Sequence, residues 1–165
     1  MDRMITREFK PGAAEKVLYL MQGVPGSGKS TIAEMIRQSY EERAPMPDRA
    51  LIISTDDHRL EPDGSYKFVA ADNARFHKLT QRDCARLMRQ GQRAIIVDNT
   101  NIQGWQAHPY LVLADIYDYT VQVVSVDCGL PLAIERQGER EGLGDRRVPP
   151  EVITDMYGKM ERLLT

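Results

Sequence analysis

The sequence predicts an α/β fold with a mainly parallel sheet of four to five strands, flanked by helices. Two observations carry this prediction. Four short apolar segments alternate with longer segments of helical periodicity, the order expected when helices connect parallel strands. In addition, a glycine-rich turn directly follows the first apolar segment, at the strand end where open parallel sheets bind their ligands.

The predicted strands are short apolar runs that end at turn residues. They cover residues 17–22, 50–54, 93–97 and 120–126. The predicted helices cover residues 29–40, 70–90, 104–118, 130–141 and 149–164. Gly91 closes the second helix. Pro109, within the third, fits only a first helical turn or a break.

Length and composition indicate one domain. The chain has 165 residues, and we expect an N-terminal arm over residues 1–16 and a single domain over residues 17–165. Because 22 basic residues nearly balance 24 acidic ones, the net charge of −2 excludes a protein that coats nucleic acid through bulk charge. There is no apolar run of ~20 residues, no signal peptide and no cysteine framework, so we expect no membrane partner and a cytoplasmic location.

Residues 23–31 match the phosphate-binding motif G-x-x-x-x-G-K-[ST] in full, between a predicted strand and a predicted helix. Its glycines allow successive backbone N–H groups to point at phosphate oxygens, and the helix N-terminus adds a favourable dipole. Lys29 is placed to reach the β- and γ-phosphates, and Ser30 offers a hydroxyl to Mg²⁺. We therefore predict a P-loop NTPase fold that uses ATP and Mg²⁺. The ATP-binding residues expected in this loop are Gly23, Pro25, Gly26, Ser27, Gly28, Lys29, Ser30 and Thr31.

A polar cluster follows the second predicted strand. The small size of the chain and the absence of a guanine-reading N-K-x-D favour a kinase over a motor or a switch. A kinase needs a carboxylate that takes the proton of the acceptor hydroxyl, and an arginine can hold an acceptor phosphate. Asp56 and Arg59 meet both needs. The alternative is a capped helix start, with Asp57 as a cap and His58 as a bystander.

Two further acids follow predicted strands. Asp98 comes after the third strand, where an acid usually acts on Mg²⁺ directly or through water. The sequence leaves open whether Asp98 serves the metal, the acceptor or only a polar turn. Asp127 comes after the fourth strand, where a simple strand-end turn explains it equally well.

Arg136 and Arg140 lie four residues apart on one face of a predicted helix. Mobile cations that close over the γ-phosphate are typical of kinases, so we predict a C-terminal helical lid over about residues 130–148. A surface helix with internal salt bridges is the alternative, because nearby acids balance these arginines.

Basic residues also recur along one face of the second predicted helix, at steps of 3, 4, 4, 3 and 4 residues. They are Arg75, Lys78, Arg82, Arg86, Arg89 and Arg93. Such a face can follow a nucleic-acid backbone, although a solvated helix face is the commoner reason for it. Trp105 and Tyr110 are candidates for base stacking, with core packing as the expected role of both.

Several motifs together resemble the P-loop kinase domain of the phage polynucleotide kinase family, from about residue 17 to residue 164. They are GVPGSGKST, STDDHR, VDNTN, the R-x-x-x-R pair and VPPEVITDMYGKM. The stretch from STDD to HPY is also similar to the polynucleotide-kinase-like domain of animal proteins that bind ubiquitin ligases. The resemblance implies transfer of the γ-phosphate of ATP to a 5′-hydroxyl of DNA or RNA, in a bacterial or phage-infected cell.

The resemblance also implies roles for single residues. Lys29 and Ser30 would bind ATP and metal, and Asp56 would be the general base. Arg59 would contact the acceptor phosphate. The lid residue Arg140 would act on ATP as a third catalytic residue beside Asp56 and Lys29, with support from Arg136.

Three other functions stay open. One alternative acceptor is a hydroxymethylated base in phage DNA, such as 5-hydroxymethyluracil, and another is a nucleoside or other small molecule. A nucleotide-binding interaction module without enzymatic activity is a further alternative, disfavoured by the joint presence of Lys29, Asp56 and Arg140.

Overall fold

The structure is a computed structural model that describes residues 15–40, 46–139 and 147–163. Residues 1–14 of the expected arm and the lid arginine Arg140 lie outside these ranges. Lys16, at the end of the expected arm, accepts a hydrogen bond from the backbone N–H of Thr120 through its carbonyl oxygen, at 2.9 Å. No helix in the described ranges is long and apolar enough to cross a bilayer.

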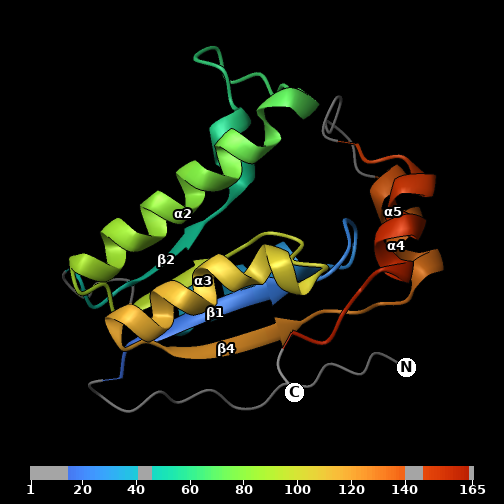
Figure 1. Cartoon of the computed structure of the whole chain (residues 1–165). Helices are drawn as coiled ribbons and strands as arrows, with labels where there is room; N and C mark the ends of the chain where they lie inside the picture. The colour runs from blue at the N-terminus through green and yellow to red at the C-terminus, as the bar shows by residue number, and fades with distance from the viewer. Residues whose placement is uncertain (1–14, 41–45, 140–146, 164–165) are drawn as a thin grey trace.

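The described chain forms a four-stranded parallel sheet in the order β2-β3-β1-β4, which confirms the predicted class (Figure 1). The strands are β1 (Val17–Gln22), β2 (Ala50–Ile53), β3 (Ala94–Val97) and β4 (Thr120–Ser125). The α-helices are α1 (Lys29–Ser39), α2 (Asn73–Arg89), α3 (Gly104–Tyr117), α4 (Leu130–Glu139) and α5 (Pro150–Gly158). Two 3₁₀-helices precede α2, namely η1 (Thr55–Arg59) and η2 (Ala70–Asp72).

Helices cover both faces of the sheet, and the side chains of each strand alternate between these two faces. Leu18 and Leu20 of β1 pack with α2 and α3, whereas Val17, Tyr19 and Met21 face α1. The central strands β1 and β3 are fully buried, as their continuous apolar sequences predict. The edge strand β4 is only half-buried, although its valine-rich sequence suggests a buried strand.

Helix α4 and helix α5 pack against each other beyond the carboxyl ends of the strands (Figure 1). Their buried contacts involve Ala133 and Ile153, which meet Val24 of the P-loop and Ile102 of the segment after β3. This small third core holds the helical pair against the phosphate-binding loop. It therefore positions α4, which belongs to the described part of the predicted lid, beside the P-loop.

Helix α3 corrects the expectation for Pro109, which lies inside the helix and not in its first turn. Proline has no N–H, so the carbonyl of Trp105, four residues earlier, loses its helical partner. Trp105 is 70% exposed, and water can therefore bind this carbonyl. The same exposure corrects the expectation that Trp105 packs in the core, whereas Tyr110 is buried there as expected.

Candidate active site

One cleft lies at the carboxyl edge of the sheet and has a volume of about 1360 Å³. The P-loop, the start of η1, the N-terminal part of α2, the turn after β4 and helices α4 and α5 all contribute to its lining. This volume exceeds the roughly 300–1,000 Å³ of a typical small-molecule pocket. The cleft therefore has room for a nucleotide and a second substrate together.

The P-loop follows β1 and leads into α1, as its motif predicts. Gly26 and Gly28 have φ angles of +84° and +93°, which side-chain-bearing residues rarely adopt. Gly26 is also packed tightly, because a Cβ there would lie 2.1 Å from the carbonyl oxygen of Ala133 in α4. The backbone of the loop therefore requires glycine for its conformation and for its approach to α4.

Lys29, Ser30 and Asp98 meet at the end of the P-loop. The Ser30 hydroxyl donates a hydrogen bond to Asp98 Oδ2 at 2.7 Å, and Lys29 Nζ lies 3.5 Å from Asp98 Oδ1. Mg²⁺ prefers oxygen ligands and takes only one or two from a protein when it binds with substrate phosphates. Ser30 and Asp98 therefore fit a metal that arrives with ATP, whereas the acceptor-binding role also predicted for Asp98 stays a prediction.

Arg136 of α4 reaches the P-loop, since its Nη1 lies 3.5 Å from the carbonyl oxygen of Ser27. A Cβ on Gly28 would be 3.6 Å from the same nitrogen. This places the guanidinium beside the loop in which we expect phosphates to bind. The position agrees with the predicted contact between Arg136 and ATP.

Asp56 lies in the same cleft, on η1, with its side chain 69% exposed. Its Oδ1 accepts a hydrogen bond from the Tyr66 hydroxyl at 3.1 Å and lies 3.3 Å from Arg59 Nε. Within the part of the chain that the structure describes, Oδ2 has no partner. The carboxylate is thus held by one oxygen, and the other is available to a hydroxyl proton.

Arg59 is buried, although it carries a charge, and is only 5% exposed. Its guanidinium lies 4.7 Å from the ring centre of Phe68 and 5.6 Å from that of Phe76, and it donates to the side-chain oxygen of Asn73. Among the described residues, its Nη1 has no hydrogen-bond partner. Leaving a buried cation without full pairing is costly, so Arg59 is suited to bind an anion.

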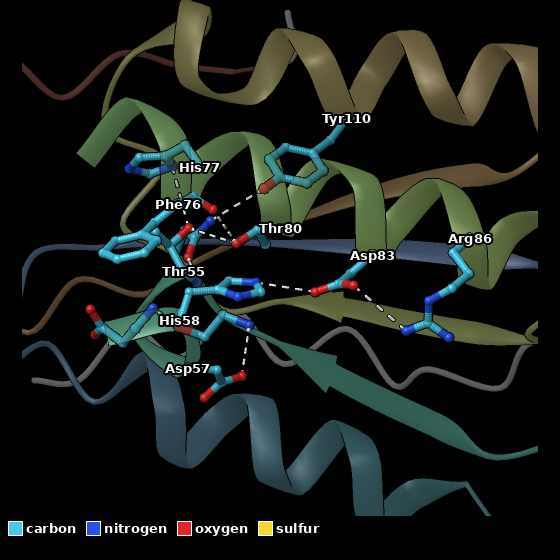
Figure 2. A network of polar contacts seen from close by, with 12 residues as sticks. Thr55, Asp57, His58, Phe76, His77, Thr80, Asp83, Arg86 and Tyr110 are labelled. Atoms are coloured by element: carbon cyan, nitrogen blue, oxygen red, sulfur yellow. Dashed lines mark hydrogen bonds and ion pairs between the residues drawn. The ribbon is translucent and has the colours of Figure 1, made fainter. Parts of the chain in front are cut away.

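Hydrogen bonds fix η1 against α2 and the end of β3 (Figure 2). The Thr55 hydroxyl lies 3.3 Å from His77 Nδ1 and 3.1 Å from the Thr80 hydroxyl, and the Thr55 N–H donates to Asn99 Oδ1 at 2.9 Å. His58 Nε2 lies 3.1 Å from Asp83 Oδ2, so this histidine ties η1 to α2.

The start of η1 is also capped, as the alternative interpretation of this cluster predicts, while the catalytic role of Asp56 stays a prediction. Ser54 Oγ accepts from the Asp56 N–H at 3.2 Å, and Asp57 Oδ2 accepts from the Ser54 N–H at 3.2 Å. Asp57 therefore completes the cap, and burial raises the pKa of its carboxyl. The neighbouring Asp56 side chain is left to face the cleft.

The pKa of His77 is lowered, first by burial and second by the nearby charge of Arg59. Burial disfavours the charged imidazolium. His77 therefore serves as a neutral hydrogen-bonding group for Thr55 at neutral pH.

Sequence reasoning missed four residues around Asp56 and Arg59. They are Tyr66, Phe68, Asn73 and His77, which all line the cleft. The Pro-Asp-Gly turn signal in the loop before them was visible, but no spacing rule connects that loop to η1. Asp127 turns out to be bound in its own turn, where it accepts from the Gly129 N–H at 2.8 Å and from the Tyr157 hydroxyl at 3.3 Å.

Comparisons with known proteins agree with this geometry. Human NEDD4-binding protein 2 is 32% identical over 105 residues, 64% of this chain and 6% of that protein. Mouse 2′,3′-cyclic-nucleotide 3′-phosphodiesterase is 32% identical over 109 residues, 66% of this chain and 23% of that protein. The chain thus spans a small part of these relatives. A solved structure of the Pnkp1/Rnl/Hen1 RNA repair complex matches with a TM-score of 0.71 at 19% identity, over 91% of this chain and 45% of the matched one.

The resemblance to polynucleotide-kinase domains and their animal relatives is confirmed by these matches. The sequence pattern of a family described as "AAA domain" matches residues 18–163. This match covers the P-loop, the polar cluster after β2 and α5, and thus well over half of the chain. The protein therefore belongs to this AAA-domain family, and its fold is that of a P-loop kinase.

Proposed function

We propose that the protein is an ATP-dependent kinase that transfers the γ-phosphate to the 5′-hydroxyl of a nucleic acid. The observation that carries this proposal is the carboxylate of Asp56, of which one oxygen is hydrogen-bonded. It lies in the same cleft as the P-loop, with Oδ1 held by Tyr66 and Oδ2 free of partners within the described chain. A positioned carboxylate of this kind is what a general base needs.

The transfer proceeds in line across the cleft. The acceptor oxygen forms a bond to the γ-phosphorus, and the bond between that phosphorus and the β–γ bridging oxygen breaks. The hydroxyl proton passes to Asp56 Oδ2, and ADP leaves. Lys29 and the backbone N–H groups of the P-loop stabilise the negative charge on the phosphates. Mg²⁺, held by Ser30 and Asp98, would supply further positive charge to the same oxygens.

Arg59 favours a nucleic-acid acceptor over a simple alcohol. Its buried guanidinium lies beside Asp56 and has an unpaired Nη1 among the described residues. A nucleotide phosphate that approaches Arg59 from the cleft, which this residue lines, would pair with its charge, because guanidinium and phosphate form strong charge-assisted hydrogen bonds. An acceptor without a phosphate would leave the charge of Arg59 without this partner.

The test is transfer of labelled phosphate from ATP to a panel of acceptors. The panel contains 5′-hydroxyl oligonucleotides of DNA and RNA, DNA with 5-hydroxymethyluracil, free nucleosides, and sugars or other small alcohols. We expect labelling of the 5′-hydroxyl oligonucleotides. Labelling of only the hydroxymethylated DNA, or of only the nucleosides or alcohols, would overturn the proposal and identify the acceptor.

A further inference from the structure

The outer face of α2 carries a row of exposed cations that the cleft does not use. We call this row the α2 basic face. It consists of Arg75, Lys78, Arg82, Arg86 and Arg89. The opposite face of the helix is buried through Thr80, Cys84, Leu87 and Met88. The sequence motif also included Arg93, but this residue lies after the helix, half-buried, with its guanidinium 5.6 Å from the ring centre of Tyr40.

Acidic partners neutralise only part of the α2 basic face. Arg75 lies 3.4 Å from Asp72, and Arg86 lies 3.7 Å from Asp83. The other three members, Lys78, Arg82 and Arg89, form no ion pair with any described residue. The face therefore keeps an excess of positive charge, although the chain as a whole carries −2.

Cation–π contacts link this face to the part of the cleft around Asp56 and Arg59, which we call the acceptor half. The ring centre of Phe76 lies 5.6 Å from the guanidinium of Arg59 and 5.0 Å from that of Arg75. A hollow of about 110 Å³ beside it is lined by these two arginines and Lys67, together with the acids Glu61 and Asp72. Cationic groups thus continue from the arginine next to Asp56 to the first member of the α2 basic face.

We propose that the α2 basic face binds the sugar–phosphate backbone of the acceptor strand, beyond the 5′-terminal nucleotide at Asp56 and Arg59. This inference rests on the proposed function. The face spans 15 residues, or roughly 20 Å of helix, so one strand can contact several of its members in succession. Because phosphates carry no base identity, these contacts would provide affinity without sequence preference.

The test uses the triple variant K78Q/R82Q/R89Q. All three side chains are exposed, and glutamine has a helix propensity close to that of lysine and arginine, so the fold should persist. Binding of a fluorescent 16-nucleotide strand is measured from 50 to 200 mM KCl. Each lost phosphate contact lowers the slope of log K against log salt by about 0.7 for a single strand. We therefore expect the slope to fall by about 2 and the affinity at 50 mM KCl to drop by at least roughly 20-fold.

Transfer kinetics give a second readout. In the variant, KM for a 16-nucleotide 5′-hydroxyl acceptor at 50 mM KCl should rise by a similar factor, whereas KM for a dinucleotide acceptor and kcat should stay unchanged. A dinucleotide is too short to reach the face. An equal rise in KM for both acceptors would overturn the inference.

The matched control is K78R/R82K/R89K, which keeps every charge in place. It should retain the affinity and the salt slope of the wild-type protein, because backbone contacts of this kind depend mainly on charge. If the slope of log K against log salt is unchanged in the glutamine variant, the α2 basic face does not bind the strand, whatever the outcome of the transfer panel. The inference would also be overturned if the glutamine variant lost binding to phosphatidylserine vesicles while its oligonucleotide binding stayed unchanged. Failure of wild-type protein to label any 5′-hydroxyl strand would refute the proposed function instead.

Discussion

In the donor half of the cleft, around Gly26 and Gly28, the backbone forms the binding surface. In the acceptor half, around Asp56, side chains from separate segments form it. The donor loop depends on positive φ angles and on a close approach to α4. The acceptor half depends on Tyr66 from the loop after η1 and on Asn73 and other side chains of α2.

This difference predicts which substitutions each half tolerates. A side chain added to the donor loop alters its backbone, and with it both ATP binding and stability. A polar atom changed in the acceptor half alters the chemistry while the P-loop keeps its shape. Variants in the two halves should therefore affect nucleotide binding and phosphate transfer to different extents.

The largest effect is expected for Asp56→Asn, which removes the proposed proton acceptor. Phosphate transfer should fall by about 10²–10⁴-fold, the usual contribution of a general base. ATP affinity should change less than about threefold, because the P-loop backbone is untouched. Single-turnover transfer and nucleotide binding by calorimetry measure the two effects.

Asp57→Asn is the matched control for this variant. Asp57 caps η1 through Ser54, so its loss should cost at most about 1 kcal/mol of stability and should leave the transfer rate near that of the wild type. A collapse of ATP affinity in Asp56→Asn would show that Asp56 is structural or metal-bound, and the contrast between the halves would fail.

Gly26→Ala tests the donor half. The new Cβ would meet the Ala133 carbonyl oxygen at 2.1 Å, at a φ of +84°. We expect the free energy of unfolding to fall by about 2–4 kcal/mol through strain and overpacking, together with loss of ATP binding. Urea unfolding and nucleotide titration measure both.

Gly64→Ala separates the two causes, because Gly64 has a similar φ of +83° but nothing within 4 Å of its Cβ position. It should cost only the backbone strain of about 1–2 kcal/mol and should leave ATP binding intact. Equal losses of stability in both variants would show that the approach to α4 contributes nothing.

Tyr66→Phe should have a moderate effect in the acceptor half. The change removes the hydroxyl that holds Asp56 Oδ1 at 3.1 Å, while Arg59 Nε still lies 3.3 Å from the same oxygen. We expect kcat to fall about 3- to 10-fold, in line with the loss of one hydrogen bond worth roughly 1 kcal/mol, with KM for ATP unchanged. A fall in ATP affinity alone would assign Tyr66 to the donor half.

The smallest effect concerns the pH dependence of stability at His77. Its pKa is lowered in the folded protein, so the unfolded chain binds its proton more tightly. The free energy of unfolding should therefore decrease as pH falls from about 6.5 towards the lower folded pKa, at about 1.4 kcal/mol per unit of pKa difference.

His77→Gln should reduce this acid sensitivity, measured by urea unfolding between pH 5 and pH 8 (roughly the range in which histidine titrates). His108→Gln is the control, because His108 is exposed on α3. An unchanged pH dependence in His77→Gln would show that burial and the charge of Arg59 do not lower the pKa of His77 in the folded protein.

Much of the fold could be predicted from the sequence, because its signals are local. Apolar runs and helical periodicity predicted the strand order along the chain and most helix ends to within a few residues. The last helix is an exception, because it was expected to reach residue 164 and ends at Gly158. The errors came from tertiary context. Pro109 is tolerated inside α3 next to an exposed Trp105, and β4 is half-buried because it lies at the edge of the sheet.

The sequence by itself determined the P-loop of the donor half. Residues 23–31 are contiguous, and their glycines permit the conformation of the loop, whereas its approach to α4 depends on tertiary packing. Only the tertiary structure decided the surroundings of Asp56 and Arg59 in the acceptor half. It brings Tyr66 to Asp56 and buries Arg59 against the rings of Phe68 and Phe76. These contacts join residues on separate elements, and their geometry comes from the packing of α2 against η1, which no spacing along the chain encodes.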